Sequence, residues 1–216
     1  MSIFPVFNAS FVGLLLLGLF TWNIWLLVFV LICIVSSIFL YLYEWGVCVA
    51  SLHYIAGFWL FILSEATIFG SLLFCCLYYD YNYYINLSSS LELPFLGCFI
   101  LLGSSLTVTS YHHLINWRLG WFPLLLTVIL GVSFICLQMV EMEEIIMNMY
   151  DTTFHASSFC TVGLHFSHVV LGVIGLATVL VVGSELFGYY RCSIVVWYWH
   201  FVDYVWLFVY AFVYVC

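Results

Sequence analysis

The stretch FWLFILSEATIFGSLLF, residues 58–74, decides the fold class, because it is a long apolar run interrupted by a single charge, Glu65. A helix needs about 20 predominantly apolar residues to cross the hydrocarbon core of a bilayer. The run extends beyond this stretch, from about Val49 to Leu77, which is long enough to span with some tilt. The stretch therefore predicts a membrane-spanning helix with a carboxyl group near its middle.

The composition of the whole chain also indicates a membrane protein. Of 216 residues, 67% are hydrophobic and only 6% are charged, whereas a soluble domain carries about 25% charged residues. So little polar surface excludes a soluble enzyme and a disordered segment. Ten acidic residues stand against two arginines, Arg118 and Arg191, and the net charge of −8 excludes a surface that holds phosphate backbones. We expect no nucleic-acid partner.

The other apolar runs predict an all-α integral membrane protein with seven transmembrane helices. The run from Phe11 to Leu42 is too long for one span, so we divide it near residues 21–23. The spans predicted after it cover residues 49–77, 95–114, 124–140, 154–182 and 194–215. These runs are continuous, whereas the strands of a membrane barrel are alternating segments of about 10 residues.

The few charges predict the orientation of the chain. With seven spans, the amino terminus and the loops after the second, fourth and sixth spans lie on one side, and Arg118 and Arg191 both fall in these loops. The positive-inside rule then places the amino terminus inside. The first 43 residues carry no charge, so we expect no signal or transit peptide. The absence of lysine beside 21 Phe and 16 Tyr suggests a U-rich coding strand, as in some organelle genomes.

Glu65 is the clearest functional candidate, because an ionised carboxylate in the middle of a membrane helix costs several kcal/mol. One interpretation is a proton-active or site-shaping carboxylate; the other is a protonated glutamate that hydrogen-bonds across helices. The chain has no lysine, and both arginines fall in predicted loops. We therefore expect Glu65 to be protonated at neutral pH and hydrogen-bonded within the bundle.

Three polar pairs have the i, i+3 spacing that places both members on one helix face. They are His165 with His168, His200 with Asp203, and Glu141 with Glu144. A carboxylate-bridged metal site in a bundle needs two E-x-x-H motifs, and a zinc protease needs H-E-x-x-H; the sequence has neither. We expect these pairs to form interhelical hydrogen bonds and the chain to hold no metal of its own.

A haem scaffold is the other metal-bearing alternative. His155 and His168 have a spacing that suits two stacked haems on one helix face, but no second helix offers a matching pair. We therefore expect no haem in this chain.

Small and aromatic residues predict how the spans pack and where they end. Glycines at 163, 172, 175 and 183 along the sixth predicted span favour close approach of a neighbouring helix. Trp117, Trp121, Trp197 and Trp199 fall at predicted span ends, which is typical of an aromatic belt.

Five ordered motifs resemble subunit III of cytochrome c oxidase, the haem–copper terminal oxidase. The last helix of that family is similar to WYWHFVDYVWLFVY at 197–210, and its sixth helix to GLHFSHVVLGVIG at 163–175. Its fifth helix is similar to LGVSFICLQMVEMEE at 130–144. The fourth and third are similar to ELPFLGCFILLGSSLTVTSYHHLI at 92–115 and FILSEATIFGSLLF at 61–74. The resemblance runs from about Leu52 to the carboxyl end and is weaker over 1–45.

The resemblance implies a non-catalytic core subunit of the oxidase that transfers electrons from cytochrome c to O2 with proton translocation. It implies one membrane domain over 1–216, in which helices 1–2 (1–45) and helices 3–7 (48–216) form two groups divided by a lipid-filled cleft. The implied roles are to stabilise subunit I, to support proton uptake and to bind phospholipid. Subunit I is the main implied partner, with subunit II and supernumerary subunits. Haem a and copper then belong to partner subunits, and the location is the mitochondrial inner membrane with the amino terminus in the matrix.

The resemblance also carries residue roles. Glu65 matches the family's intramembrane glutamate, and the three polar pairs match recurring family positions. We expect Trp45 and Trp59 to contact lipid. The loops after the second helix and before the last helix are short here and lack the family's basic residues, and His155 replaces a small residue.

Two alternatives remain open from the sequence. A small secondary transporter or proton channel needs half-helices broken near the midplane, whereas Pro5, Pro94 and Pro123 all lie near span ends. A pure assembly or scaffold protein cannot be separated from the oxidase subunit by sequence.

Overall fold

The predicted all-α membrane fold is confirmed by a computed structural model, which describes residues 4–21, 23–47, 55–79, 87–115, 117 and 119–215. Within these ranges the regular elements are helices. They are α1 (Phe4–Phe20), α2 (Ile24–Val47), α3 (Ile55–Tyr79), α4 (Leu93–His113), α5 (Trp121–Glu144), α6 (Thr153–Val182), α7 (Ser184–Phe187), α8 (Tyr189–Val209) and the π-helix η2 (Tyr210–Val215). Helices α3 to α6, and α8 with η2, are long and apolar enough to cross a membrane.

The chain divides into two compact units, residues 1–53 and residues 54–216. The first unit is the hairpin of α1 and α2, and the predicted division near residues 21–23 is confirmed. The hydroxyl of Thr21 donates to the carbonyl of Leu17 at 2.7 Å, and the side chain of Asn23 accepts from the amide of Leu26 at 3.3 Å. These two side chains satisfy backbone groups at the end of α1 and the start of α2. The lipid-filled cleft between helices 1–2 and the rest stays a prediction.

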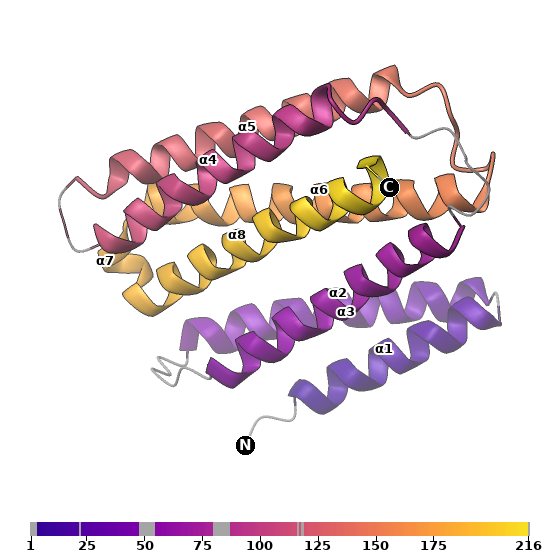
Figure 1. Cartoon of the computed structure of the whole chain (residues 1–216). Coiled ribbons are helices and arrows are strands. Elements are labelled where there is room, and N and C mark those ends of the chain that lie inside the picture. The colour runs from indigo at the N-terminus through magenta and orange to yellow at the C-terminus, as the bar shows by residue number, and fades with distance from the viewer. Residues whose placement is uncertain are drawn as a thin grey trace. The chain divides into compact units, whose positions relative to one another are not determined.

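In the second unit, helices α4, α5, α6 and α8 pack around a common core, and α3 packs on α6 and α8 (Figure 1). Three aromatic side chains, Phe134, Trp199 and Trp206, are fully buried in this core. Helix α3 buries few residues and exposes most of its apolar surface. Such exposure is expected where the neighbour is lipid rather than water.

The burial of Trp199 corrects one of the sequence interpretations and explains the position of two glycines. Its indole is fully buried, so its assignment to an aromatic belt is wrong. A Cβ atom added at Gly172 would lie 2.8 Å from this indole, and one added at Gly131 would lie 2.9 Å from it. The glycines on α5 and α6 therefore leave room for the ring of Trp199, which projects from α8. The predicted close approach is confirmed at Gly172, and an added Cβ at Gly175 would lie 3.5 Å from Val195. At Gly163 and Gly183 an added Cβ would meet nothing within 4 Å among the described residues, so their packing role stays a prediction.

Local signals determine where the helices begin and end. The side chain of Thr152 caps α6 by accepting from the amide of His155 at 3.1 Å. Gly183 and Gly188 have φ values of +84° and +92°, which glycine adopts without strain, and they separate the short α7 from α6 and α8. Pro94 lies in the first turn of α4, where its missing amide hydrogen costs nothing.

Candidate functional site

The middle of the second unit joins α3 to α6 through two polar side chains. Glu65 on α3 and His168 on α6 approach with their Oε2 and Nε2 atoms 2.9 Å apart. The Glu65 side chain is 17% exposed and that of His168 is 10% exposed. The histidine partner was missed by the sequence reasoning, which considered only lysine and arginine.

The other ring nitrogen of His168 determines where the proton between the two residues lies. Nδ1 is 2.8 Å from the carbonyl oxygen of Leu164, one turn earlier on α6. A carbonyl oxygen only accepts, so Nδ1 carries a hydrogen and donates it. The neutral form of His168 then presents Nε2 as an acceptor, and Glu65 must be the protonated donor. If His168 is protonated on both nitrogens, Glu65 is the ionised acceptor instead.

Both arrangements place one proton on the line between Oε2 and Nε2, and both leave the pair with no net charge. Separating the charges is costly in an apolar interior, so the arrangement with protonated Glu65 needs less desolvation. Phe69 packs edge-on against His168 with ring centroids 5.3 Å apart, which adds to the apolar surroundings. The neutral state of Glu65 stays a prediction.

His165 turns to a different neighbour from His168, although the two share the i, i+3 spacing. Its Nε2 donates to the carbonyl of Val202 on α8 at 3.2 Å. The ring is 1% exposed and packs against Phe134 and Trp206, with centroids 5.8 Å and 4.9 Å away. This histidine therefore joins α6 to α8, whereas His168 joins α6 to α3.

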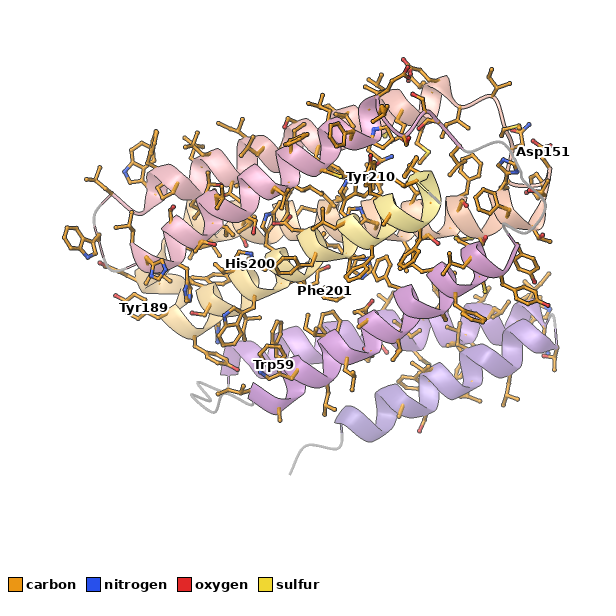
Figure 2. All side chains as sticks on the ribbon, in the orientation of Figure 1. Trp59, Asp151, Tyr189, His200, Phe201 and Tyr210 are labelled. Atoms are coloured by element: carbon orange, nitrogen blue, oxygen red, sulfur yellow. The ribbon has the colours of Figure 1, made fainter. Side chains whose placement is uncertain are left out.

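His200 (labelled in Figure 2) and Asp203 on α8 both contact serines of α4. His200 Nδ1 lies 2.9 Å from the hydroxyl of Ser105. Asp203 is 3% exposed, and the Ser104 hydroxyl contacts its Oδ1 at 3.5 Å. The indole of Trp199 donates to Ser104 at 2.9 Å and so holds the serine in place. The serines of α4 are functional neighbours that single-sequence reasoning did not find, because hydroxyls are common in membrane helices.

Glu141 and Glu144 differ in their surroundings. Glu141 is 1% exposed; Gln138 donates to its Oε2 at 2.7 Å and Ser88 to its Oε1 at 3.2 Å. Glu144 is the last residue of α5 and is exposed. The Ser88 contact fastens the segment before α4 to the end of α5.

Of the two tryptophans that are expected to contact lipid, the structure describes the side chain of one. Trp59 on α3 (labelled in Figure 2) is 55% exposed. Its ring stacks on that of Trp197 of α8, with ring centroids 5.9 Å apart. The side chain of Trp45 lies outside the described residues. Contact with lipid stays a prediction for both.

The acidic, histidine and cysteine side chains do not converge in threes in the part of the chain that the structure describes. His155, the other half of the haem-spaced pair, lies at the capped start of α6 and contacts Thr152 there. The polar groups that the structure brings together are instead pairs that join neighbouring helices. The expectation that the chain carries no metal or haem stays a prediction.

Comparison with known proteins assigns a family to this arrangement. The family model described as Cytochrome c oxidase subunit III matches residues 46–216. The chain is similar to Cytochrome c oxidase subunit 3 of Rhipicephalus sanguineus, with 34% identity over 179 residues that cover 73% of this chain and 68% of the relative. It is 37% identical to the protein of that name from Loxodonta africana over 134 residues, which cover 57% of this chain and 50% of the relative. The corresponding protein of Struthio camelus is 36% identical over 140 residues, covering 60% and 52%. The chain thus spans about half of the length of the latter two relatives.

Proposed function

The chain belongs to the cytochrome c oxidase subunit III family, and from that premise we propose that it is a core, non-catalytic subunit of a cytochrome c oxidase. In this assembly, electrons pass from cytochrome c to O2 in partner subunits, which hold haem a and copper. This chain contributes no redox centre. Subunit I is its main partner, with subunit II and supernumerary subunits around it.

The proposal is supported mainly by the hydrogen bonds that the interior polar groups form between neighbouring helices. Glu65 with His168 joins α3 to α6, His165 joins α6 to α8, and His200 joins α8 to α4. Hydrogen bonds of this kind between membrane helices hold a bundle in one arrangement. A bundle fixed in this way suits a subunit that steadies a neighbouring subunit during turnover.

Proton uptake and lipid binding are the finer parts of the proposal. The Glu65–His168 pair holds one exchangeable proton near the middle of α3 and α6, which supports a role beside a proton-uptake path in the partner subunit. The large exposed apolar surface of α3 supports contact with phospholipid. We place the chain in the mitochondrial inner membrane as a multi-pass, organelle-encoded protein with its amino terminus in the matrix.

The transporter or proton-channel alternative is disfavoured by the continuity of the helices. Such proteins bind their substrate where helices are broken near the midplane. Helices α3, α4, α5 and α6 run without interruption between their ends. The pure scaffold alternative differs from the proposal only in whether the assembled partner contains haem.

Copurification tests the proposal directly. The chain, captured under mild detergent through an affinity tag, should bring with it a partner that shows the reduced-minus-oxidised absorption of haem a in fixed ratio to the chain. Recovery of the chain with partners that carry no haem a would contradict the proposal.

A further inference from the structure

Asp203 places a carboxyl group in the core of the second unit with few hydrogen bonds. Its side chain is 3% exposed, and its Oδ2 atom has no hydrogen-bond partner among the described residues. Its Oδ1 atom lies 3.5 Å from the hydroxyl of Ser104. That hydroxyl has a nearer acceptor for its one hydrogen, the carbonyl oxygen of Leu101 at 2.7 Å. The carboxyl group is therefore weakly bonded at one oxygen and unbonded at the other.

The charged and donor groups of the neighbouring helices are engaged elsewhere or lie far away. Arg191 lies near the start of α8, about 18 Å from Asp203 along the helix axis. Arg118 comes after the end of α4 in the sequence, whereas Ser104 lies near the middle of that helix. The indole N–H of Trp199 donates to Ser104 and not to Asp203. Asp203 Oδ2 therefore needs a partner of another kind.

His165 on α6 supplies a second open atom. Its ring is 1% exposed, and its Nε2 lies 3.2 Å from the carbonyl oxygen of Val202 on α8. A carbonyl oxygen only accepts, so Nε2 carries a hydrogen and donates it. The other ring nitrogen, Nδ1, has no hydrogen-bond partner among the described residues. In a neutral imidazole this nitrogen is an acceptor, and it needs a donor.

Two contacts bring Asp203 and His165 to one level of the bundle. The carbonyl that His165 bonds belongs to Val202, and its peptide group joins Val202 to Asp203. The His165 ring also packs against Trp206, with ring centroids 4.9 Å apart. Trp206 shares a face of α8 with Asp203, because the two are three residues apart. The two open atoms therefore belong to neighbouring side chains that form no direct hydrogen bond with each other.

A water molecule is the ligand that matches both atoms chemically. One of its O–H groups donates to His165 Nδ1. The other donates to Asp203 Oδ2, or the water oxygen accepts from Oδ2 if that atom carries the carboxyl proton. Buried waters in proteins typically bridge polar groups that are otherwise unsatisfied. A metal ion needs more ligands, and acidic, histidine and cysteine side chains do not converge in threes within the described ranges.

We propose that one buried water molecule binds between Asp203 Oδ2 and His165 Nδ1 and joins α6 to α8 in the core of the second unit. Figure 1 shows these two helices side by side with α4, which contributes Ser104 next to Asp203. The proposal depends on the packing of the second unit and not on the place of the chain in an oxidase.

Electron cryo-microscopy of the purified assembly that contains the chain tests the proposal, at a resolution that shows ordered waters. We expect one density peak about 2.5–3.2 Å from both Oδ2 and Nδ1, the range of hydrogen bonds. Direct contact between the two side chains, or resolved side chains with no peak between them, would overturn the proposal. A peak about 2.0–2.1 Å from Nδ1 would indicate a metal ion and would overturn it as well.

Variants separate the water site from the other contacts of the two side chains. Asp203→Asn keeps a polar atom at the Oδ2 position and should retain the peak. Asp203→Leu has a similar size without polar atoms and should lose it, as should His165→Phe. Thr178→Val is the control on α6, because it removes an exposed hydroxyl that bonds to the carbonyl of Gly175 in its own helix, and it should retain the peak. A peak that persists in Asp203→Leu would contradict the proposal.

Thermal unfolding gives a second readout for variants that are too unstable for microscopy. Removal of either side chain already breaks the bridge through the water, so the two substitutions should not be additive. The fall in the unfolding midpoint of the double variant Asp203→Leu, His165→Phe should be smaller than the sum of the two single falls. Additive falls would show that the two side chains share no ligand.

Discussion

At the scale of single residues, the carbonyl of Leu164 determines which nitrogen of His168 faces Glu65. Its oxygen accepts a hydrogen bond from His168 Nδ1, with the N and O atoms 2.8 Å apart, and so leaves Nε2 to face Glu65. The proton shared by Glu65 and His168 then lies between Oε2 and Nε2. Because of this arrangement, Glu65→Gln and Glu65→Ala should differ in their effect on stability.

Glu65→Gln should leave the assembly intact, because the amide NH2 of glutamine donates to Nε2 as the protonated carboxyl does. Glu65→Ala should lower stability by about 1–3 kcal/mol, the cost of leaving a buried nitrogen without its partner. Thermal unfolding of the purified assembly measures both. Ser64→Ala is the matched control, since among the described residues the Ser64 hydroxyl bonds to the carbonyl of Phe61 in its own helix and to no other helix. Equal loss of stability in Gln and Ala variants would contradict the neutral-carboxyl account.

Infrared difference spectroscopy tests the same proton without removing the partner. If Glu65 is protonated near neutral pH, the wild-type spectrum contains a protonated carboxyl C=O stretch that Glu65→Gln lacks. If the band is absent, Glu65 is ionised and His168 is the charged member of the pair.

The sequence singled out Glu65 and His168 by residue type and by the cost of polar groups in lipid. It did not predict that they meet, because the pairing depends on how α3 and α6 are rotated about their axes. Local spacing instead grouped His168 with His165, and the structure directs these two histidines to different helices. The spacing of residues along one helix shows which of them share a face of that helix. It does not show which neighbouring helix packs against that face.

At the scale of helices, the close contact between Gly172 and the Trp199 indole makes a direct prediction. Gly172→Ala should destabilise the bundle by about 1–3 kcal/mol, because the added methyl group overpacks a fully buried ring. Gly163→Ala lies on the same helix with nothing within 4 Å and should be neutral or stabilising by up to about 1 kcal/mol. The thermal unfolding midpoints of the two variants, compared side by side, measure this difference. Equal midpoints would show that Trp199 moves aside without cost.

Helix existence was predicted well from apolar runs, whereas helix ends were not. The fifth span, predicted over 124–140, is the helix Trp121–Glu144, and the last, predicted from residue 194, begins at Tyr189. Hydropathy marks the part of a helix that lies in hydrocarbon, and helices continue into the polar interface beyond it. The short α7 was missed because its limits come from two glycines with positive φ rather than from an apolar pattern.

At the scale of the whole molecule, lipid is expected between helices 1–2 and the remaining bundle. Acyl chains should hold it, because the chain has only two basic residues with which to hold phosphate. An experimental structure of the assembly in a bilayer checks this expectation. Helices 1–2 packed directly on the other helices, with no lipid between them, would contradict it.

We also predict that the isolated chain binds no metal or haem of its own. The reason is the sequence pattern, which lacks E-x-x-H motifs and a second histidine pair at haem spacing. Metal analysis of the chain, after the catalytic subunits have been stripped away, should return no stoichiometric iron, copper or zinc. One tightly held metal ion per chain would be the opposite result.

The central claim is that this chain steadies an oxidase whose redox centres belong to other subunits. Its most direct test is to remove the chain from the purified assembly with detergent, then to record the haem a spectrum and the time course of cytochrome c oxidation. The account predicts that the haem a content and the initial rate are retained, while activity declines faster during continued turnover than in the intact assembly. Loss of haem a in proportion to the chain removed would contradict the account.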